Sequence, residues 1–340
     1  MSSGYGEAES RIPYLQSRSV PRHQSRTQQV ESPAQPLVQC LGAVMQVIGA
    51  GYPGNEPRRW LAGELGRRGN HHHAGVDELG HGARQVPGLG DQQYGTNILA
   101  LEDGGVDTSL LTTLEGYPTS TTILPIDEQG RRPTLHAPGA GSVPPLSDEL
   151  MHAATSVRCL HYGGIGAPTL DGGPGESLLK AAKSAGVEVV CDLIAPGPTA
   201  AEELARLLPY VAWFLPSAEE ARLLTGEEDL QAAADAFLAM GAKNCVIKDG
   251  ERGAVLAAGE LRGRLPAFRI EVVDTTTCGD SFCAGFVAAH LKGASDFDAL
   301  RFAAATAAMV AQGLATYGKL ESYEQVERAM KTLPLAETGA

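Results

Sequence analysis

The stretch that decides the fold runs from Arg269 to Gly293 and reads Arg-Ile-Glu-Val-Val-Asp-Thr-Thr-Thr-Cys-Gly-Asp-Ser-Phe-Cys-Ala-Gly-Phe-Val-Ala-Ala-His-Leu-Lys-Gly. Its β-branched run from Ile270 to Val273 predicts a strand, and the small polar residues from Asp274 to Gly279 predict a tight turn. Residues 281–291 have the composition of a buried helix. The amides that start such a helix have no partner inside it and carry the positive end of its dipole, so they can bind an anion such as a phosphoryl group. Asp280 would lie beside that anion, where a carboxylate can accept the proton of an attacking hydroxyl.

A single Asp near a helix start can also be a helix cap and nothing more. The complete string favours chemistry, because Asp274 to Asp280 resembles the Asp-Thr-x-Gly-Ala-Gly-Asp signature of the ribokinase (PfkB) family of sugar and nucleoside kinases. Thr275 and Gly279 are kept at the same spacing, as are both Asp residues. Thr277 stands where the family has Gly and Cys278 where it has Ala.

The resemblance implies a ribokinase-like α/β fold, a three-layer sandwich with a mostly parallel central sheet and a small β lid. It also implies transfer of the ATP γ-phosphoryl group to a hydroxymethyl group of a small sugar or nucleoside. Asp280 would be the base, and the amides of Thr277, Cys278 and Gly279 would form the anion hole. Thr277 cannot adopt the conformations that only glycine reaches, so its effect on the rate stays open.

The composition limits the partners. The 340 residues contain 27 basic and 40 acidic side chains and carry a net charge of -13, which argues against nucleic acid or an anionic membrane as the main partner. The six Cys residues show no paired metal-site spacing, so reduced thiols in a cytoplasmic protein are expected. No apolar run approaches the roughly 20 residues that span a bilayer, and the N-terminus lacks an apolar signal core.

The domain plan has three parts. Residues 1–36 are rich in Ser, Gln, Arg and Pro, which predicts a disordered extension. Residues 37–330 form the expected kinase domain, and 331–340 form a C-terminal tail. The resemblance makes 37–49 the opening strand and puts Gln46 where the family has a substrate-binding Asp, although Gln lacks the charge that strengthens such a bond.

Residues 50–88 depart from the family pattern. Gly69 and Asn70 occupy the place of the substrate loop, but they lie between Arg67-Arg68 and three His residues, with almost no aliphatic periodicity. Asn and His codons (AAY and CAY) read one base later give Thr or Ile, and the same shift permits Gly-Gly-Ala-Thr-Thr-Thr, which is similar to the family's loop. Translation out of frame and ordinary divergence both remain open for this segment. The lid would come from parts of the chain near 50–60 and 118–137.

From residue 90 onward the family pattern resumes. Residues 119–125 and 133–136, separated by a turn, predict a β-hairpin. Strands and helices then alternate at βαβ spacing, among them strands at 187–191 and 244–248 and a helix at 229–240, which predicts a parallel sheet with ligands at the carboxyl ends of its strands. Gly164 follows one strand and is a substrate-side candidate, because it allows close approach of a ligand. Ser217 and Glu220 follow another and resemble the family's Asn-x-x-Glu motif, which implies that Glu220 places Mg²⁺ through water. A helix capping box explains the same two residues equally well, and both can hold.

The nucleotide side is expected at Lys248, Gly250 and Gly253, although two Gly residues three apart also mark hairpins. The resemblance adds Thr275 to the nucleotide site and Asp274 as the candidate ligand of a monovalent cation such as K⁺. No P-loop sequence occurs, so ATP and Mg²⁺ would bind in the ribokinase manner. The resemblance allows a homodimer formed through the lid. The alternative is a nucleotide-binding relic or regulator, since Gln46, Thr277 and the substrate loop all depart from the family.

Overall fold

The computed structural model describes residues 146–163, 165–193, 196–313 and 318–337, with Leu110 and five short strands earlier in the chain. Every described residue belongs to one unit, within 34–340. The predicted extension over 1–36 and nearly all of segment 50–88 lie outside the described residues.

The elements follow one another in this order: β1 Val44–Ile48, β2 Trp60–Leu61, β3 Val106–Asp107, β4 Thr121–Ile123, β5 Leu135–Ala137, α2 Asp148–Thr155, β6 Cys159–Gly163, α3 Pro174–Ser184, β7 Glu188–Cys191, α4 Ala200–Leu207, the 3-10 turn η3 Leu208–Tyr210, β8 Trp213–Phe214, α5 Ala218–Thr225, α6 Leu230–Ala239, β9 Asn244–Lys248, the 3-10 turn η4 Gly250–Arg252, β10 Ala254–Ala258, β11 Leu261–Leu265, α7 Cys278–Leu291, α8 Asp296–Ala311 and α9 Tyr323–Thr332.

The main sheet has seven strands in the order β1-β6-β7-β8-β9-β10-β11. Strands β6 to β9 pair in parallel, whereas β1 and β10 run antiparallel to their neighbours. Five of the seven strands, β6 to β9 and β11, therefore run in one direction. The predicted mostly parallel α/β sheet is confirmed.

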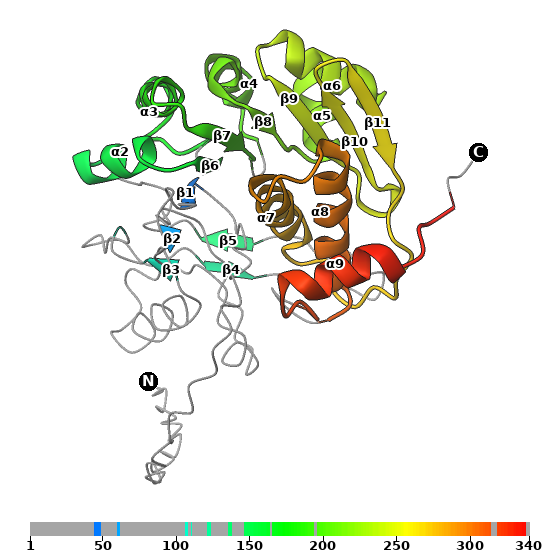
Figure 1. The fold of residues 1–340 in the computed structure, drawn as a ribbon. Coiled ribbons are helices and arrows are strands. Elements are labelled where there is room, and N and C mark those ends of the chain that lie inside the picture. The colour runs from blue at the N-terminus through cyan, green and yellow to red at the C-terminus, as the bar shows by residue number, and fades with distance from the viewer. Residues whose placement is uncertain are drawn as a thin grey trace, which may run out of the picture. The chain divides into compact units, whose positions relative to one another are not determined.

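Helices cover both faces of this sheet (Figure 1). Alternate residues of each strand point to opposite faces, and they divide between two cores. Leu160, Val189 and Ile247 pack in the core that contains α2 to α6, whereas Val190 and Val246 pack in the core that contains α7, α8 and α9. Two cores on opposite faces of one sheet make the three-layer sandwich.

Helices α7 and α8 pack unusually closely at Gly285. A Cβ there would overlap the Thr306 hydroxyl and would lie 2.8 Å from Thr306 Cβ and 3.1 Å from Ala303 Cα. Thr306 is fully buried and its hydroxyl donates to the Phe302 carbonyl, so it has no room to turn away. Only glycine fits this contact.

Most predicted elements are found, but the strand predicted from Ile270 to Val273 is wrong. Val272 and Val273 are more than half exposed, and the Val273 amide donates to the carbonyl of Ala311 at the end of α8. β-branched residues favour strands only where a neighbouring strand supplies partners, and this segment meets a helix end instead. A non-strand segment therefore leads into α7.

The predicted hairpin is present as the antiparallel pair β4–β5, and β2 pairs in parallel with β3. Their assignment to a lid remains a prediction. The predicted domain boundary at residue 330 falls inside α9, which ends at Thr332. Residues after α9 also contact the rest of the domain, because the Ala336 amide donates a hydrogen bond to the Ala267 carbonyl.

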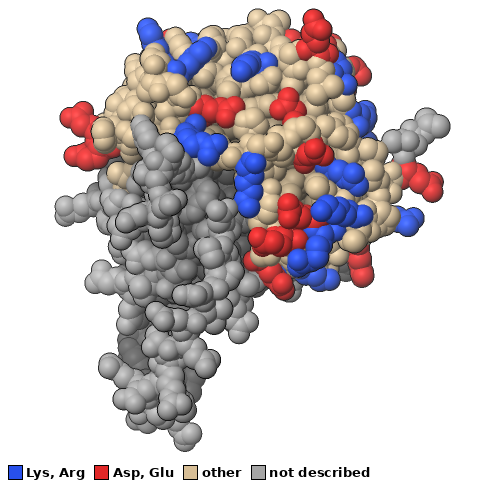
Figure 2. Space-filling view, in the orientation of Figure 1, with Lys and Arg blue, Asp and Glu red and all other residues tan. Residues whose placement is uncertain are grey.

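Charged side chains of both signs lie on the described surface. Figure 2 shows acidic and basic side chains interspersed over the described part of one face, without a continuous basic area. Within the described residues, no helix is both long and apolar enough to cross a bilayer.

A pH-dependent contact ties the last turn of α7 to β7. His290 Nε2 lies 3.0 Å from both carboxylate oxygens of Glu188, which raises the pKa of His290 and, through the same hydrogen bond, lowers that of Glu188. The His290 contribution is complete below its ordinary pKa of 6.5 and is lost as pH rises through the raised value. The Glu188 contribution is present above 4.5 and is lost as pH falls through the lowered value, so the pair stabilises most between about 4.5 and 6.5.

We expect His290→Gln to lower the free energy of unfolding by about 0.5–1 kcal/mol at pH 6 and by clearly less at pH 8.5. Urea unfolding at both pH values measures the difference. His152→Gln, at an exposed position in the last turn of α2, is the control. An equal loss at the two pH values would contradict the charged pair.

Candidate active site

The first turn of α7 carries the predicted base. The helix begins at Cys278 after the cap residue Thr277, so Asp280 is its third residue, and its side chain is half-buried. The Ser281 amide donates to the Thr277 carbonyl at 2.8 Å and closes the first helical hydrogen bond. Gly279 is exposed. The predicted helix is present, but it begins at Cys278, earlier than the predicted start at Ser281.

Thr277 has a left-handed backbone, with φ 60° and ψ 10°. Among the described residues it is the only one other than glycine with a positive φ. Threonine thus occupies the family's glycine position with a backbone conformation that it adopts only at an energetic cost. The turn requires the left-handed region, which threonine can reach, and not a conformation reserved for glycine. The effect of Thr277 on the rate stays a prediction.

We expect Thr277→Gly to raise the free energy of unfolding by about 1 kcal/mol, because relief of a β-branched left-handed residue outweighs the added freedom of the unfolded chain. Chemical denaturation measures the change. Thr276→Gly is the control, since Thr276 does not have a positive φ, and we expect it to destabilise. A loss of stability in Thr277→Gly would contradict the strain.

The turn before α7 is held by its own hydrogen bonds. Asp274 Oδ1 accepts from the Thr276 amide at 2.9 Å and from its hydroxyl at 2.7 Å. The Cys278 amide donates to the Thr275 carbonyl at 3.3 Å, a long bond that an anion could replace. The turn is therefore preformed, and Asp274 takes part in it through its carboxylate.

A buried charged cluster lies beside this turn. Lys248 Nζ donates to both carboxylate oxygens of Asp192 at 3.0 and 2.9 Å, and it lies 3.3 Å from Cys283 Sγ. Cys283 Sγ donates to Asp192 Oδ2 at 3.1 Å. A Cβ built on Gly279 would have Lys248 Nζ as its nearest neighbour, at 3.8 Å. The lysine thus links two strand ends to the first turn of α7.

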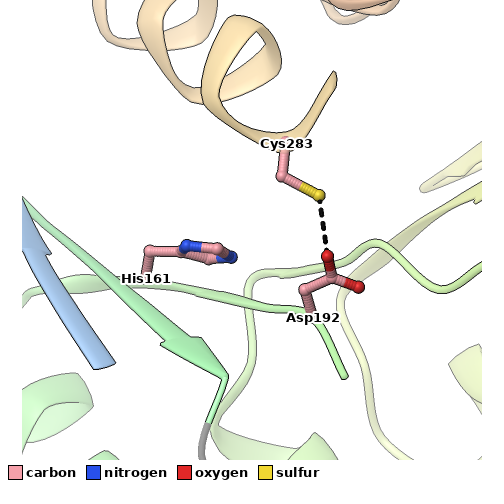
Figure 3. A group of neighbouring side chains, drawn as sticks. All are labelled: His161, Asp192 and Cys283. Carbon is pink, nitrogen blue, oxygen red and sulfur yellow. Dashed lines mark hydrogen bonds between the residues drawn. The ribbon is translucent and has the colours of Figure 1, made fainter. Parts of the chain in front are cut away.

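Strand geometry explains why these residues meet. Side chains alternate between the two faces, so His161 on β6, Asp192 just after β7 and Lys248 at the end of β9 continue the face that α7 covers. Parallel strands bring their carboxyl ends to one edge of the sheet, where ligands bind in such folds. Figure 3 shows His161 and Asp192 below the helix that carries Cys283, with the Cys283 side chain reaching down to the carboxylate of Asp192.

His161 is the neutral member of this group. It is 6% exposed, and its Nε2 has no hydrogen-bond partner among the described residues. Burial lowers the pKa of His161 to about 4, against an opposing effect of Asp192. The imidazole is therefore uncharged at neutral pH. In the antiparallel pairing of β6 with β1, His161 lies opposite Gln46.

Ser217 and Glu220 form the helix capping box that was one of the two predictions for their motif. The Ser217 hydroxyl accepts from the Glu220 amide at 3.2 Å, and Glu220 Oε2 accepts from the Ser217 amide at 2.7 Å, which together form a capping box at the start of α5. Burial, and then the charge of Asp192, raise the pKa of Glu220, while Lys248 lowers it. The capping role is confirmed, and the second carboxylate lies within electrostatic reach of the cluster.

The predicted nucleotide turn is closed tightly. The Asp249 amide donates to the Gly253 carbonyl at 2.7 Å and the Gly253 amide to the Gly250 carbonyl at 3.1 Å. Gly253 has φ 98° and ψ -131°, which an L residue rarely adopts. Asp249 is fixed by Arg252 and Arg264 at 2.7 and 3.3 Å. The turn starts directly after Lys248.

The structure assembles part of the predicted site. Lys248 and Gly279 lie together, and Ser217 pairs with Lys248 through an isolated bridge. Gln46 lies on β1, of which the structure describes the backbone, while Gly69, Asn70 and Gly164 fall outside the described residues.

Three members of the cluster, Asp192, His161 and Cys283, had no predicted role. Asp192 could have been found, because it directly follows the predicted strand Val187 to Cys191 at the carboxyl edge.

Comparison with known proteins identifies the family. The model of the pfkB family of carbohydrate kinases matches residues 74–322, which are 249 of the 340 residues. The chain belongs to the pfkB family of carbohydrate kinases. The members of this family are phosphotransferases. The match begins at residue 74, inside segment 50–88. An out-of-frame origin for the segment remains a prediction, which the nucleotide sequence would test.

Relatives of this pfkB family member include kinases of different substrates. It is 37% identical to 2-dehydro-3-deoxygluconokinase of Bacillus subtilis over 125 residues, which cover 35% of the chain and 39% of that enzyme. It is 27% identical over 224 residues to an uncharacterised sugar kinase of Archaeoglobus fulgidus, covering 64% of the chain and 87% of the relative. The matched segment thus spans well under half of the Bacillus enzyme.

A solved structure extends the likeness to most of the fold. Ribokinase II of E. coli, solved in complex with ATP and Mg²⁺, superposes with a TM-score of 0.63 at 19% sequence identity, covering 84% of this chain and 95% of that one. At this identity the likeness concerns the fold, and it confirms the ribokinase-like sandwich.

Proposed function

We propose that the chain transfers the γ-phosphoryl group of ATP to a hydroxymethyl group of a small sugar or nucleoside. The observation that carries the proposal is the first turn of α7, where Asp280 follows a preformed turn of small residues beside a buried lysine. Helix-start amides and a positive charge suit a phosphoryl group, and a carboxylate beside them suits proton transfer. Family membership supports the same reaction.

Different residues of the chain would have separate roles in the transfer. Asp280 accepts the proton of the acceptor hydroxyl, and the amides of Thr277, Cys278 and Gly279 bind the transferred group. Gly250 and Gly253 leave room for backbone to approach the nucleotide, with Thr275 on the same side.

The metal would be held on the Glu220 side. Mg²⁺ fits there because it prefers oxygen ligands and keeps its waters, and Glu220 lies close enough to the Asp192 carboxylate for that charge to raise the pKa of Glu220. When bound, the ion would neutralise charge on the phosphates. Asp274 remains the proposed ligand of a K⁺-type cation.

The acceptor side rests on fewer residues. Gln46, Gly69, Asn70 and Gly164 are its proposed contacts, on the family resemblance alone. We further propose a cytoplasmic enzyme whose lid strands can form a homodimer.

A nucleotide-binding relic or regulator is the second candidate. The strained Thr277 favours it, because a turn tuned for catalysis would be expected to carry glycine at that position.

A two-stage measurement tests the proposal. Thermal unfolding is followed with ATP-Mg²⁺ and then with added sugars or nucleosides, and ADP release is measured for every acceptor that stabilises the protein. A kinase is stabilised by both ligands and releases ADP, a regulator responds to nucleotide alone, and a relic responds to neither. Stabilisation by nucleotide without turnover on any acceptor would contradict the kinase proposal.

A further inference from the structure

Lys248 contacts both Asp192 and Cys283 in the buried cluster. Its side chain is 13% exposed and that of Asp192 is 10% exposed, so the pair is largely removed from water. Burial alone would lower the pKa of Lys248, but Asp192, Cys283 and Glu220 together raise it above its ordinary value. The ammonium therefore stays charged beside the start of α7.

A buried ion pair seldom stabilises a fold more than apolar side chains of the same size would. Stability alone therefore gives no reason to place this pair at the carboxyl edge of the sheet. The location of the pair suggests a functional reason, because Lys248 Nζ lies next to Gly279, one residue before the proposed base. An ammonium there would face the same anion that the helix amides would bind.

A metal ion is the competing occupant. One ligand atom each from His161, Asp192 and Cys283 lie within 4.8 Å of one another, and nitrogen, oxygen and sulfur ligands suit Zn²⁺. Lys248 Nζ, however, already contacts Asp192 and Cys283. A divalent ion would have to displace the ammonium that neutralises the carboxylate, so the contacts favour lysine as the cation of this site.

We propose that Lys248 binds the transferred phosphoryl group at the start of α7, and that Asp192 is a positioning residue that holds the ammonium there. The inference rests on the proposed kinase function. In the reaction, the acceptor oxygen forms a bond to the γ-phosphorus and the bond to the β,γ-bridging oxygen breaks, so ADP leaves with the electron pair. The acceptor proton goes to Asp280, while Lys248 keeps its protons and interacts through charge and hydrogen bonds.

The main test compares Lys248→Met, Lys248→Arg and the double variant Lys248→Met with Asp192→Asn. Turnover, the Kd values for ATP and ADP by calorimetry, and urea unfolding are measured for each. We expect Lys248→Met to lower kcat by about 10²–10³-fold, as for loss of one donor to a developing anion, and to reduce the preference for ATP over ADP. Lys248→Arg should recover part of both.

The double variant separates catalysis from structure. It removes both charges, so we expect it to regain most of the stability that Lys248→Met loses, without regaining turnover. Arg262→Met, which breaks the more exposed pair with Asp235, should leave the nucleotide preference unchanged. Recovery of turnover in the double variant to within about threefold of wild type would show a structural pair and overturn the inference.

The remaining outcomes are also decisive. If the wild type transfers no phosphoryl group to any acceptor but prefers ATP over ADP, and Lys248→Met abolishes that preference, the kinase proposal fails and the phosphoryl contact stands. If turnover is normal in Lys248→Met, the contact fails and the kinase proposal stands. Binding of neither nucleotide defeats both. Tight binding of Zn²⁺ by the wild type, lost in His161→Ala, would identify a metal site and overturn the lysine assignment.

Discussion

Asp280→Asn is expected to lower kcat by about 10²–10⁴-fold, which is the usual contribution of a positioned general base. The substitution keeps the size of the side chain and its place as the third residue of α7, so the fold and the binding of ATP should change little. A loss confined to kcat would mean that the carboxylate acts on the reacting hydroxyl. Steady-state kinetics with calorimetric ATP binding measures both quantities.

The chain provides a closely matched control. Asp298 is the third residue of α8, and its carboxylate accepts a hydrogen bond from the Ser295 hydroxyl at 2.7 Å. Asp298→Asn makes the same chemical change at the same helical position, away from the cluster. If Asp280→Asn retains more than a few percent of the wild-type rate, as Asp298→Asn should, Asp280 is a helix-start residue and the base assignment is wrong.

The largest effect on stability is expected from Gly253→Ala. A Cβ at this position would overlap the Leu265 carbonyl oxygen and lie 2.8 Å from the Ala267 amide nitrogen, both of which are backbone atoms that cannot rotate away. Its φ of 98° adds strain for any L residue. Together, strain and overpacking should cost about 3–5 kcal/mol in the free energy of unfolding.

Gly250→Ala, three residues earlier in the same turn, isolates the steric part. Gly250 also has a positive φ, of 54°, but a Cβ there would meet no atom within 4 Å. We expect a loss of roughly 1 kcal/mol, typical of a left-handed alanine. Denaturant unfolding of both variants provides the comparison, and similar losses at the two positions would argue that contact with Leu265 has no part in the effect.

Local sequence patterns were sufficient to predict several strands and helices. The strand Asn244 to Lys248 was predicted with the bounds that the structure has, and the helix predicted from residue 229 begins after Asp229 as its cap. Periodicity and capping residues determine such elements locally. The same holds for the turn before α7, which the run of small residues predicted.

Contacts between distant residues could not be predicted in this way. The strand predicted at Ile270 fails because its neighbour in space is the end of α8, which no local pattern reveals. The ion pair of Asp192 with Lys248 joins residues 56 positions apart, and it depends on strand order. The strand-end rule points to Asp192, but only the assembled sheet shows that the lysine crosses to the start of α7.

The contact at Gly285 also limits how the site can move. Because the Thr306 side chain of α8 packs directly against the backbone of α7 at Gly285, neither helix can slide along the other without breaking this contact. The amides of their buried turns should therefore be among the slowest of the protein to exchange with deuterium. Any rearrangement that admits an acceptor and releases its product would then have to occur in segments outside this helix pair.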